Sequence, residues 1–242
     1  MRRLSDADVL RVWEVGRRAS AGHRARAVLE AAGAASESSA ALDALTLGER
    51  DVRLFAVRRR TFGDVMDCSV VCPACGERLE FRLDATSLGP DVAEYVADAR
   101  PATIVAAGYR ATVRPATVGD IDALVAVGEE SVLDRCLLAA DRDGVTVAPA
   151  ALPPEVLSAI DERLAAADPA AVTELALACP ACSQAWTQLF DVGGFLWAEI
   201  SALAERLFRE VHTLARAYGW SETAILALGA ARRERYLELV AT

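Results

Sequence analysis

Four of the six cysteines stand in two identical Cys-Pro-Ala-Cys motifs, at 72–75 and 179–182. A thiolate is a soft metal ligand, and four thiolates at the corners of a tetrahedron bind Zn²⁺ without an open coordination position. The two-residue spacing allows one tight turn to present two sulfur atoms to the same ion. The pattern therefore predicts a closed, structural Zn²⁺ site with the ligands Cys72, Cys75, Cys179 and Cys182.

Each motif opens one copy of an internal repeat. Residues 72–84 align without gaps on residues 179–191, and each copy runs from the cysteine turn through a strand-like stretch to an aspartate. Gly76 follows the first turn and supplies a permissive backbone there. Ser183 stands at the equivalent place in the second copy, which is tolerable but less favourable. We expect two hairpins, each with a dithiol at its tip and each supplying half of the metal site.

The cysteines have other chemical uses. Iron could occupy the same four-sulfur cage. A thioredoxin-like redox pair is less favoured, because a strand and not a helix N-terminus follows each motif. Cys68, four residues before Cys72, could replace a ligand, although a buried free thiol is the simpler interpretation. Cys136 falls in an apolar segment and is expected to be a core residue of a helix.

The sequence offers little for catalysis. Its two histidines, His23 and His212, stand outside any His-Glu-x-x-His spacing. We find no glycine-rich phosphate loop, no Gly-x-Ser-x-Gly elbow and no paired-carboxylate motif. The sequence therefore predicts a protein that is not an enzyme.

Composition restricts the class of protein and of partner. The chain has 242 residues, of which 53% are hydrophobic and 25% charged, a globular balance. Its net charge of −9 disfavours a general nucleic-acid binder, since phosphate neutralisation supplies most non-specific affinity. No apolar run suits a membrane span, and no apolar segment follows the N-terminal residues as in a secretion signal. We expect a cytoplasmic protein in a reducing compartment, where cysteines bind metal more often than they form disulfides.

Capping signals and apolar periodicity place the expected elements. Ser5 and the capping box Thr46-Leu47-Gly48-Glu49 each begin a helix. Gly219 ends a long helix that the apolar repeat over 196–218 predicts. The other expected helices cover 24–31, 118–127, 130–140, 155–166 and, last, 232–237, with a short helix opened by Asp168 and Pro169. Strands are expected at 65–71 and 78–83, on both sides of the second cysteine motif, and in a hairpin over 103–113 that turns at Gly108. Segments 33–40 and 141–154 are expected to be loops.

These elements predict an α+β fold, mainly α-helical, with a small four-cysteine zinc-ribbon β element and one further β-hairpin. Residues 1–64 form an N-terminal helical region, and 65–84 with 173–192 form the ribbon from two distant hairpins. Residues 85–172 are an insertion with the β-hairpin and helices, and 193–242 form a C-terminal helical region. Because the ribbon uses both ends of the insertion, we expect one continuous unit without a free linker.

Segments along the whole chain resemble a known family. The resemblance lies in what we term the C-terminal block, the segments 195–200, 210–215, 218–222 and 225–228, together with the two Cys-Pro-x-Cys hairpins, the opening Leu4-Ser5-Asp6-Ala7-Asp8 and the Gly108-Tyr109-Arg110 turn. These features resemble the baseplate hub assembly chaperones of T-even-type phages, encoded with contractile tails and related injection systems. The C-terminal block is the most specific of them.

The resemblance implies an assembly chaperone, or a minor structural component, of the baseplate or hub of a contractile particle, with baseplate or hub proteins as partners. It implies no catalytic residue. The partner-binding candidates in and after the block are Trp197, His212, Tyr218, Trp220, Arg232 and Arg233. Two alternatives stay open. The arginine runs 58–60 and 232–235 could serve a zinc-ribbon nucleic-acid-binding regulator, and the cysteine pairs could serve a thiol oxidoreductase.

Overall fold

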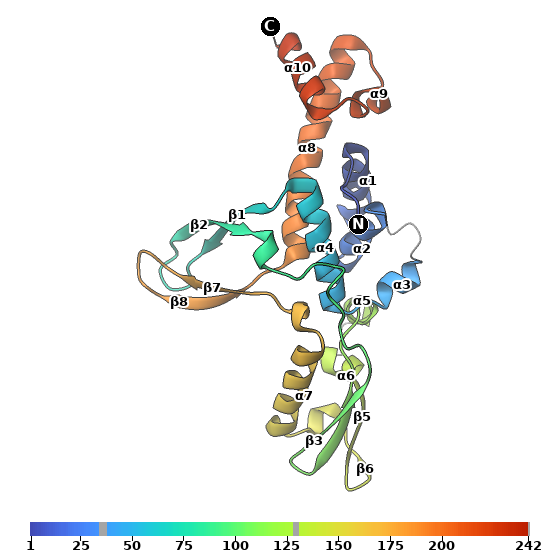
Figure 1. The fold of residues 1–242 in the computed structure, drawn as a ribbon, viewed down its shortest axis with the longest axis vertical. Coiled ribbons are helices and arrows are strands. Elements are labelled where there is room, and N and C mark those ends of the chain that lie inside the picture. Colours follow the sequence, from blue (N-terminus) through green and yellow to red (C-terminus); the bar gives the residue numbers. More distant parts are fainter. Residues whose placement is uncertain (34–37, 128–130, 242) are drawn as a thin grey trace.

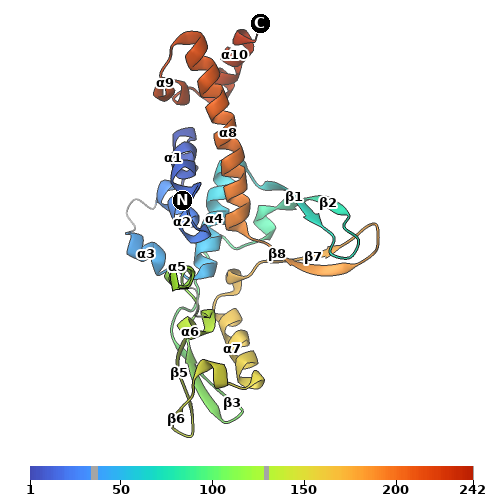
Figure 2. The same cartoon turned by 180° about the vertical axis from the view of Figure 1, so that it is seen from behind.

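The computed structural model describes residues 1–33, 38–127 and 131–241. A helical body lies at the centre, and three extensions leave it in different directions (Figure 1, Figure 2). We term these the thiol arm, built from two hairpins, the insertion lobe, built from a sheet and two helices, and the C-terminal cap at the far end of the longest helix. The mainly helical α+β class is confirmed.

Capped helices form the first part of the body: α1 Asp6–Gly16, α2 Ala21–Ala31, α3 Ser39–Asp43 and α4 Leu47–Phe62. Ser5 and Thr46 close capping boxes with acids three residues later, as their spacing predicts. Helix α2 begins three residues before its predicted start because Ser20 caps it. Helix α3 has no counterpart in the prediction, and it begins in the expected loop 33–40, of which residues 34–37 are outside the described residues.

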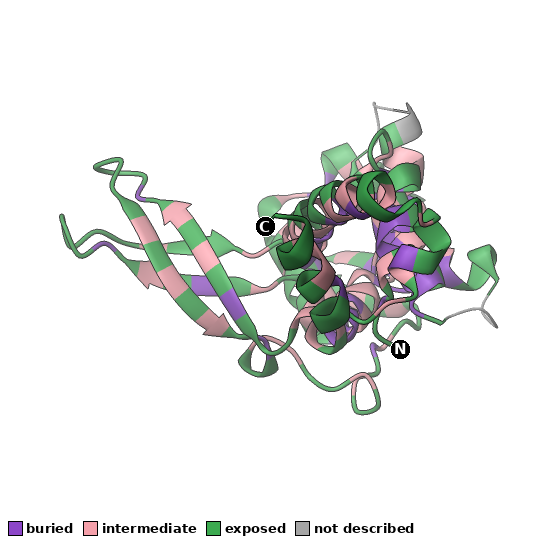
Figure 3. Cartoon of the chain, turned by 90° about the horizontal axis from the view of Figure 1, so that it is seen from above, coloured by how far each residue is buried: buried purple, intermediate pink, exposed green. Residues whose placement is uncertain are grey.

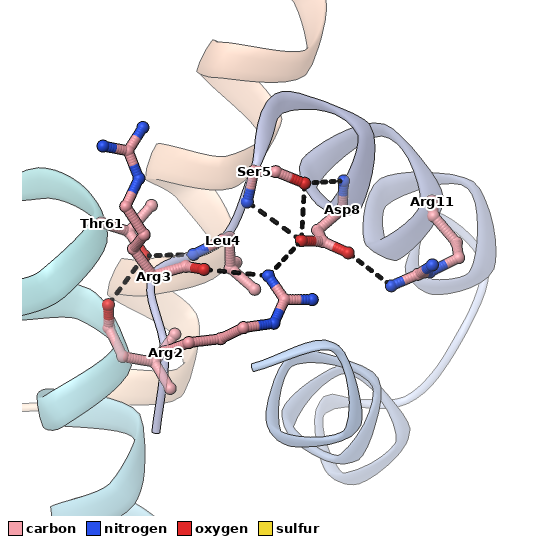
Figure 4. A network of polar contacts seen from close by, with 8 residues as sticks. Arg2, Arg3, Leu4, Ser5, Asp8, Arg11 and Thr61 are labelled. Atoms are coloured by element: carbon pink, nitrogen blue, oxygen red, sulfur yellow. Dashed lines mark hydrogen bonds and ion pairs between the residues drawn. The ribbon is translucent and has the colours of Figure 1, made fainter. Parts of the chain in front are cut away.

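The N-terminal residues are held by a polar network around the carboxylate of Asp8 (Figure 4). This carboxylate accepts hydrogen bonds from the backbone N–H and the hydroxyl of Ser5, and it forms ion pairs with Arg2 and Arg11. Leu4 donates its backbone N–H to Thr61 Oγ1 on α4, 3.1 Å away. The chain is therefore fixed to α4 just before α1 begins.

The body has one hydrophobic core, to which both ends of the chain contribute. Helix α8, Val192–Tyr218, buries one apolar stripe against α1, α2 and α4. The core residues from α8 share near-complete burial: Val192, Leu196, Ile200, Ala204 and Leu207. Helix α5, Val118–Val127, also joins this body through Val118, although it belongs to the insertion by sequence. The predicted regions 1–64 and 193–242 thus share one core.

The thiol arm consists of two antiparallel hairpins that project from the body (Figure 1). Strands β1 Val65–Val71 and β2 Arg78–Asp84 form one two-stranded sheet, and β7 Glu174–Ala178 and β8 Ala185–Leu189 form the other. No β-ladder joins the two sheets among the described residues. The arm is mostly exposed or half-buried, in contrast to the body (Figure 3). Its hairpins have little core of their own, and two-stranded hairpins are marginally stable in isolation.

The insertion lobe differs from the prediction of a single hairpin. Strands β3 Ala102–Ala106 and β4 Tyr109–Val113 form the predicted hairpin, but β5 Leu137–Arg142 and β6 Val145–Thr146 extend it to a four-stranded antiparallel sheet. Helix α7, Pro154–Ala167, contacts β3 and β4. The lobe has its own core: Ala111, Val113, Ala140, Leu152, Val156 and Ile160.

The predicted helix 130–140 is wrong in its second half. Helix α6 covers only Val132–Cys136, and the next residues form β5; Glu130 lies outside the described residues. Strand β5 pairs with β4, and Asp143 and Gly144, both with positive φ, turn it back to β6. The expected loop 141–154 therefore begins as a hairpin. Pairing with β4 overrides the local helical pattern, because tertiary contacts outweigh weak intrinsic propensity.

The helix end at Gly219 and the last helix are confirmed, and the last helix is longer than the predicted 232–237. Gly219, with φ 68°, ends α8 in the left-handed conformation that glycine favours. Ser221 caps α9, Glu222–Leu226, and α10 covers Ala230–Val240. These two helices and the last two turns of α8 form the C-terminal cap. Within the described ranges, none of the helices combines the length and the apolar character needed to cross a membrane.

Candidate metal centre

The two cysteine turns fold alike because the same backbone hydrogen bonds close them. Cys72 donates its N–H to the carbonyl of Glu77, and its own carbonyl accepts from Gly76. In the second copy Cys179 donates to Gln184 and accepts from Ser183. Gly76 and Ser183 have φ values of 76° and 60°. The two positions, predicted to be equivalent, thus share a backbone conformation with positive φ. A serine adopts this conformation at some cost in energy.

The four sulfur atoms of Cys72, Cys75, Cys179 and Cys182 meet at the tip of the arm, all within 4.8 Å of one another. Cys72 Sγ lies 3.7 Å from Cys182 Sγ, and Cys75 Sγ lies 3.6 Å from Cys179 Sγ. A tetrahedron with Zn–S bonds of about 2.3 Å separates its sulfur atoms by about 3.8 Å. Disulfide bonds, at about 2.05 Å, do not fit these distances. The group has the ligand number, ligand type and spacing of a four-thiolate metal site.

Burial divides the four ligands into two pairs. Cys72 and Cys179 are buried, whereas Cys75 and Cys182 are exposed. Burial acts to raise the pKa of Cys72, but backbone N–H groups of Cys75 and Ala74 lower it to about 7. At Cys75 a backbone hydrogen bond from Glu77 acts to lower the pKa, but the neighbouring thiols, Cys182 first, raise it to about 12. Thiolates this close together repel one another unless a cation lies between them.

The other two cysteines lie apart from this centre. Cys68 is half-buried on β1, where its thiol points at the carbonyl of Met66, 3.8 Å away. Burial raises the pKa of Cys68. Cys136 is fully buried at the end of α6, so its predicted role as a core residue is confirmed, and burial raises the pKa of its thiol too. Neither thiol belongs to the metal group.

The partner-binding candidates fall into exposed and packed groups. His212 and Arg232 are exposed, and Tyr218 is 39% exposed. Tyr218 stacks on Trp220 with ring centroids 4.7 Å apart, and Tyr236 meets both rings edge-on. Trp197 is a packing residue, because its ring lies against Gly16 and under the guanidinium of Arg24.

Arg233 does not lie on an exposed surface. Its side chain is buried at the junction of three elements, with ion pairs to Asp6 at 2.7 Å and Glu210 at 2.8 Å and a hydrogen bond to the carbonyl of Leu228. A buried guanidinium needs such partners to offset its lost hydration. Arg233 therefore holds α10 to α8 and α1, and it is not part of an exposed partner-binding surface.

The arginine run 58–60 is likewise split. Arg58 is 2% exposed, and its guanidinium forms two hydrogen bonds with the carboxylate of Glu199 on α8. It also donates to the carbonyls of Gly63 and Val65. Arg59 and Arg60 occupy the last turn of α4, where they suit the negative end of the helix dipole. Neither arginine run presents an unbroken basic surface.

Asp168 has a role that its sequence position does not reveal. The sequence predicts it as the cap of the short helix that follows, but that 3₁₀ helix, Pro169–Ala171, has no side-chain cap. Its carboxylate instead accepts the backbone N–H of Gly48 at 2.9 Å and the hydroxyl of Tyr95. Asp168 thus joins the insertion lobe to the first turn of α4. No local sequence signal could indicate this role, because Asp168 and Gly48 are 120 residues apart in the chain.

No family model, curated protein or solved structure matches the chain. The assignment of the centre therefore depends on its own donor set and geometry.

Proposed function

We propose that this protein is a non-enzymatic assembly chaperone, or a minor structural component, of the baseplate or hub of a contractile injection particle or phage tail. The observation that carries the proposal is the arrangement of three separate extensions around one helical body (Figure 1). Such a shape can contact several subunits at once, as the assembly of a baseplate requires. The resemblance of the C-terminal block supplies the kind of particle.

We propose that the centre holds one Zn²⁺ and that its role is structural. All four donors are thiols, which leaves a tetrahedral ion no position for a substrate. Cys75 and Cys179 lie 104 residues apart, so the ion closes a long loop between two hairpins that share no ladder. A cross-link over a loop of this length removes much conformational freedom from the unfolded chain. The ion would thus make the arm one rigid unit.

The C-terminal cap supplies the partner surface that the family resemblance suggests. Tyr218, His212 and Arg232 are all exposed there, and aromatic residues with arginine are typical of interface hot spots. The aromatic trio of Tyr218, Trp220 and Tyr236 holds the end of α8 against α10 and gives this surface a fixed shape.

Deletion of the gene in the cell that makes the particle tests this function. We expect sheathed particles to disappear in electron micrographs and free sheath or tube protein to accumulate. Cys72→Ser/Cys75→Ser should behave like the deletion, whereas Cys68→Ser, outside the metal group, should restore assembly. Unchanged numbers of complete particles in the deletion strain would contradict the proposal.

A further inference from the structure

A groove lies where the helical body, the insertion lobe and the base of the thiol arm meet. Its volume is about 530 Å³, within the range of roughly 300–1,000 Å³ that ligand sites occupy. Apolar side chains from several elements line it: Leu47, Pro115, Val132, Cys136, Leu164 and Val172. Val132 and Val172 are 44% and 59% exposed, so the apolar surface continues over the rim. An exposed apolar surface of this kind is typical of a binding site.

Among the described residues that line the groove, every charged side chain is a carboxylate: Asp161, Asp168 and Glu174. Both carboxylate oxygen atoms of Asp168 already accept hydrogen bonds, from the backbone N–H of Gly48 and the hydroxyl of Tyr95. Asp161 on α7 and Glu174 on β7 are exposed, and neither has an ion-pair partner among residues 1–33, 38–127 and 131–241. Two unpaired negative charges therefore border an apolar floor.

We propose that this groove binds a short segment of a partner protein that carries apolar side chains together with arginine or lysine. The apolar floor would take the aliphatic side chains, and Asp161 and Glu174 would pair with the cationic ones. The same carboxylates repel the phosphates of nucleic acids and of lipid headgroups. Because walls from the body, the lobe and the arm all contribute, the bound segment would contact all three parts. This inference rests on the proposed function, for which it names one partner-binding surface.

Selection from a display library of random dodecapeptides tests the groove even though the natural partner is unidentified. The immobilised target is the full chain loaded with zinc, and the comparison target is Asp161→Arg/Glu174→Arg. Glu80→Arg/Glu94→Arg, which places the same charge change on exposed carboxylates elsewhere, is the matched control. We expect the wild type and the control to enrich peptides that are apolar and basic. Such a peptide should bind the Asp161→Arg/Glu174→Arg variant at least about tenfold more weakly than it binds the wild type. The same peptide with its basic residues replaced by glutamate should bind that variant more tightly than it binds the wild type.

Two results would overturn the proposal that the groove binds such a segment. One is the absence of any peptide enriched by the wild type over the Asp161→Arg/Glu174→Arg variant. The other is an enriched set without a basic bias, including sets that bind both targets equally. The proposed function is tested separately by particle assembly. Should the gene be needed for sheathed particles while Asp161→Arg/Glu174→Arg supports them fully, the groove proposal fails and the assembly function stands.

Discussion

The residue after each Cys-Pro-Ala-Cys turn has a positive φ, and the two copies place different residues there. Glycine adopts this conformation freely, while an L-residue with a side chain pays steric strain. Ser183→Gly should therefore raise the free energy of unfolding, and Gly76→Ala should lower it, each by about 1 kcal/mol. Denaturant unfolding of the metal-loaded proteins measures both. If neither substitution changed the free energy of unfolding, φ at these positions would not matter for stability.

The carboxylate of Asp120 makes the stability of the fold depend on pH. Burial acts to raise the pKa of Asp120, but its pair with Arg114 and hydrogen bonds from Thr117 lower it to about 2. An unfolded aspartate has a pKa of about 3.9, so the folded state favours the ionised form. The stability from this group is complete above pH ~4 and is lost as the pH falls toward ~2. At Asp8 burial also acts to raise the pKa, but the pair with Arg2 and the hydrogen bonds from Ser5 lower it overall. The stability from Asp8 therefore depends on pH in the same direction as that from Asp120.

Asp120→Asn isolates this contribution. At neutral pH we expect it to cost about 1.5–3 kcal/mol, since it weakens hydrogen bonds to a charged group. Acid also displaces metal from thiolates, so the informative quantity is the difference in unfolding free energy between wild type and Asp120→Asn. This difference should shrink as the pH falls from ~5 to ~2. A difference that does not change with pH would contradict the assignment.

What could be foreseen at the residue scale depended on chemistry that is local in the sequence. The four metal-group cysteines stand out because each pair lies in one turn and the pairs repeat. Arg58 and Arg233 could not be recognised as buried, because their carboxylate partners come from other elements far along the chain. Burial of such a group is decided by the tertiary fold alone.

At the scale of the elements, helix α4 depends on a close approach at its first turn. A Cβ at Gly48 would lie 2.1 Å from a carboxylate oxygen of Asp168 and 2.9 Å from the backbone nitrogen of Ala171. Gly48→Ala should therefore push the insertion lobe away from α4 and break the buried hydrogen bonds, at a cost of about 2–4 kcal/mol. Gly229→Ala, where no atom lies within 4 Å, is the control and should cost little. Thermal unfolding of both variants is the measurement, and similar losses would refute this picture.

The joint between α4, β1 and α8 gives another prediction. Arg58→Leu leaves the carboxylate of Glu199 and the carbonyls of Gly63 and Val65 without their donor. Loss of one partner of a buried ion pair costs about 3–5 kcal/mol. Arg58→Leu/Glu199→Leu should lose less than the sum of the single changes, as a double-mutant cycle would measure. Arg59→Leu, whose pair with Asp64 is more exposed, should cost under about 1 kcal/mol. Additive losses at Arg58 and Glu199 would contradict direct coupling.

The elements were foreseen where a local signal decided them. Capping residues and glycine marked α1, α4 and α8, and two-residue periodicity marked the strands of the arm. The segment 137–142 was missed because its apolar residues suit a helix as well as a strand. Its partner β4 decides the choice, and no local pattern contains that information.

On the scale of the whole molecule, the chain leaves the helical body, forms the lobe and returns to complete the arm. The Cys-Pro-Ala-Cys repeat predicted that the two hairpins meet, and the four sulfur atoms do lie together. The wider sheet of the lobe and the groove beside it could not be predicted, since each depends on contacts between distant segments. The position of α5 in the body and not in the lobe has the same cause.

Metal content and ligand geometry of the native protein test the central claim most directly. Protein purified without chelators should contain one zinc ion per chain by native mass spectrometry, and X-ray absorption should show four sulfur neighbours at about 2.3 Å. Cys72→Ser/Cys75→Ser should abolish the metal, and Cys68→Ser should retain it. A chain that is isolated folded and without any metal, or a metal with nitrogen or oxygen ligands, would contradict the account.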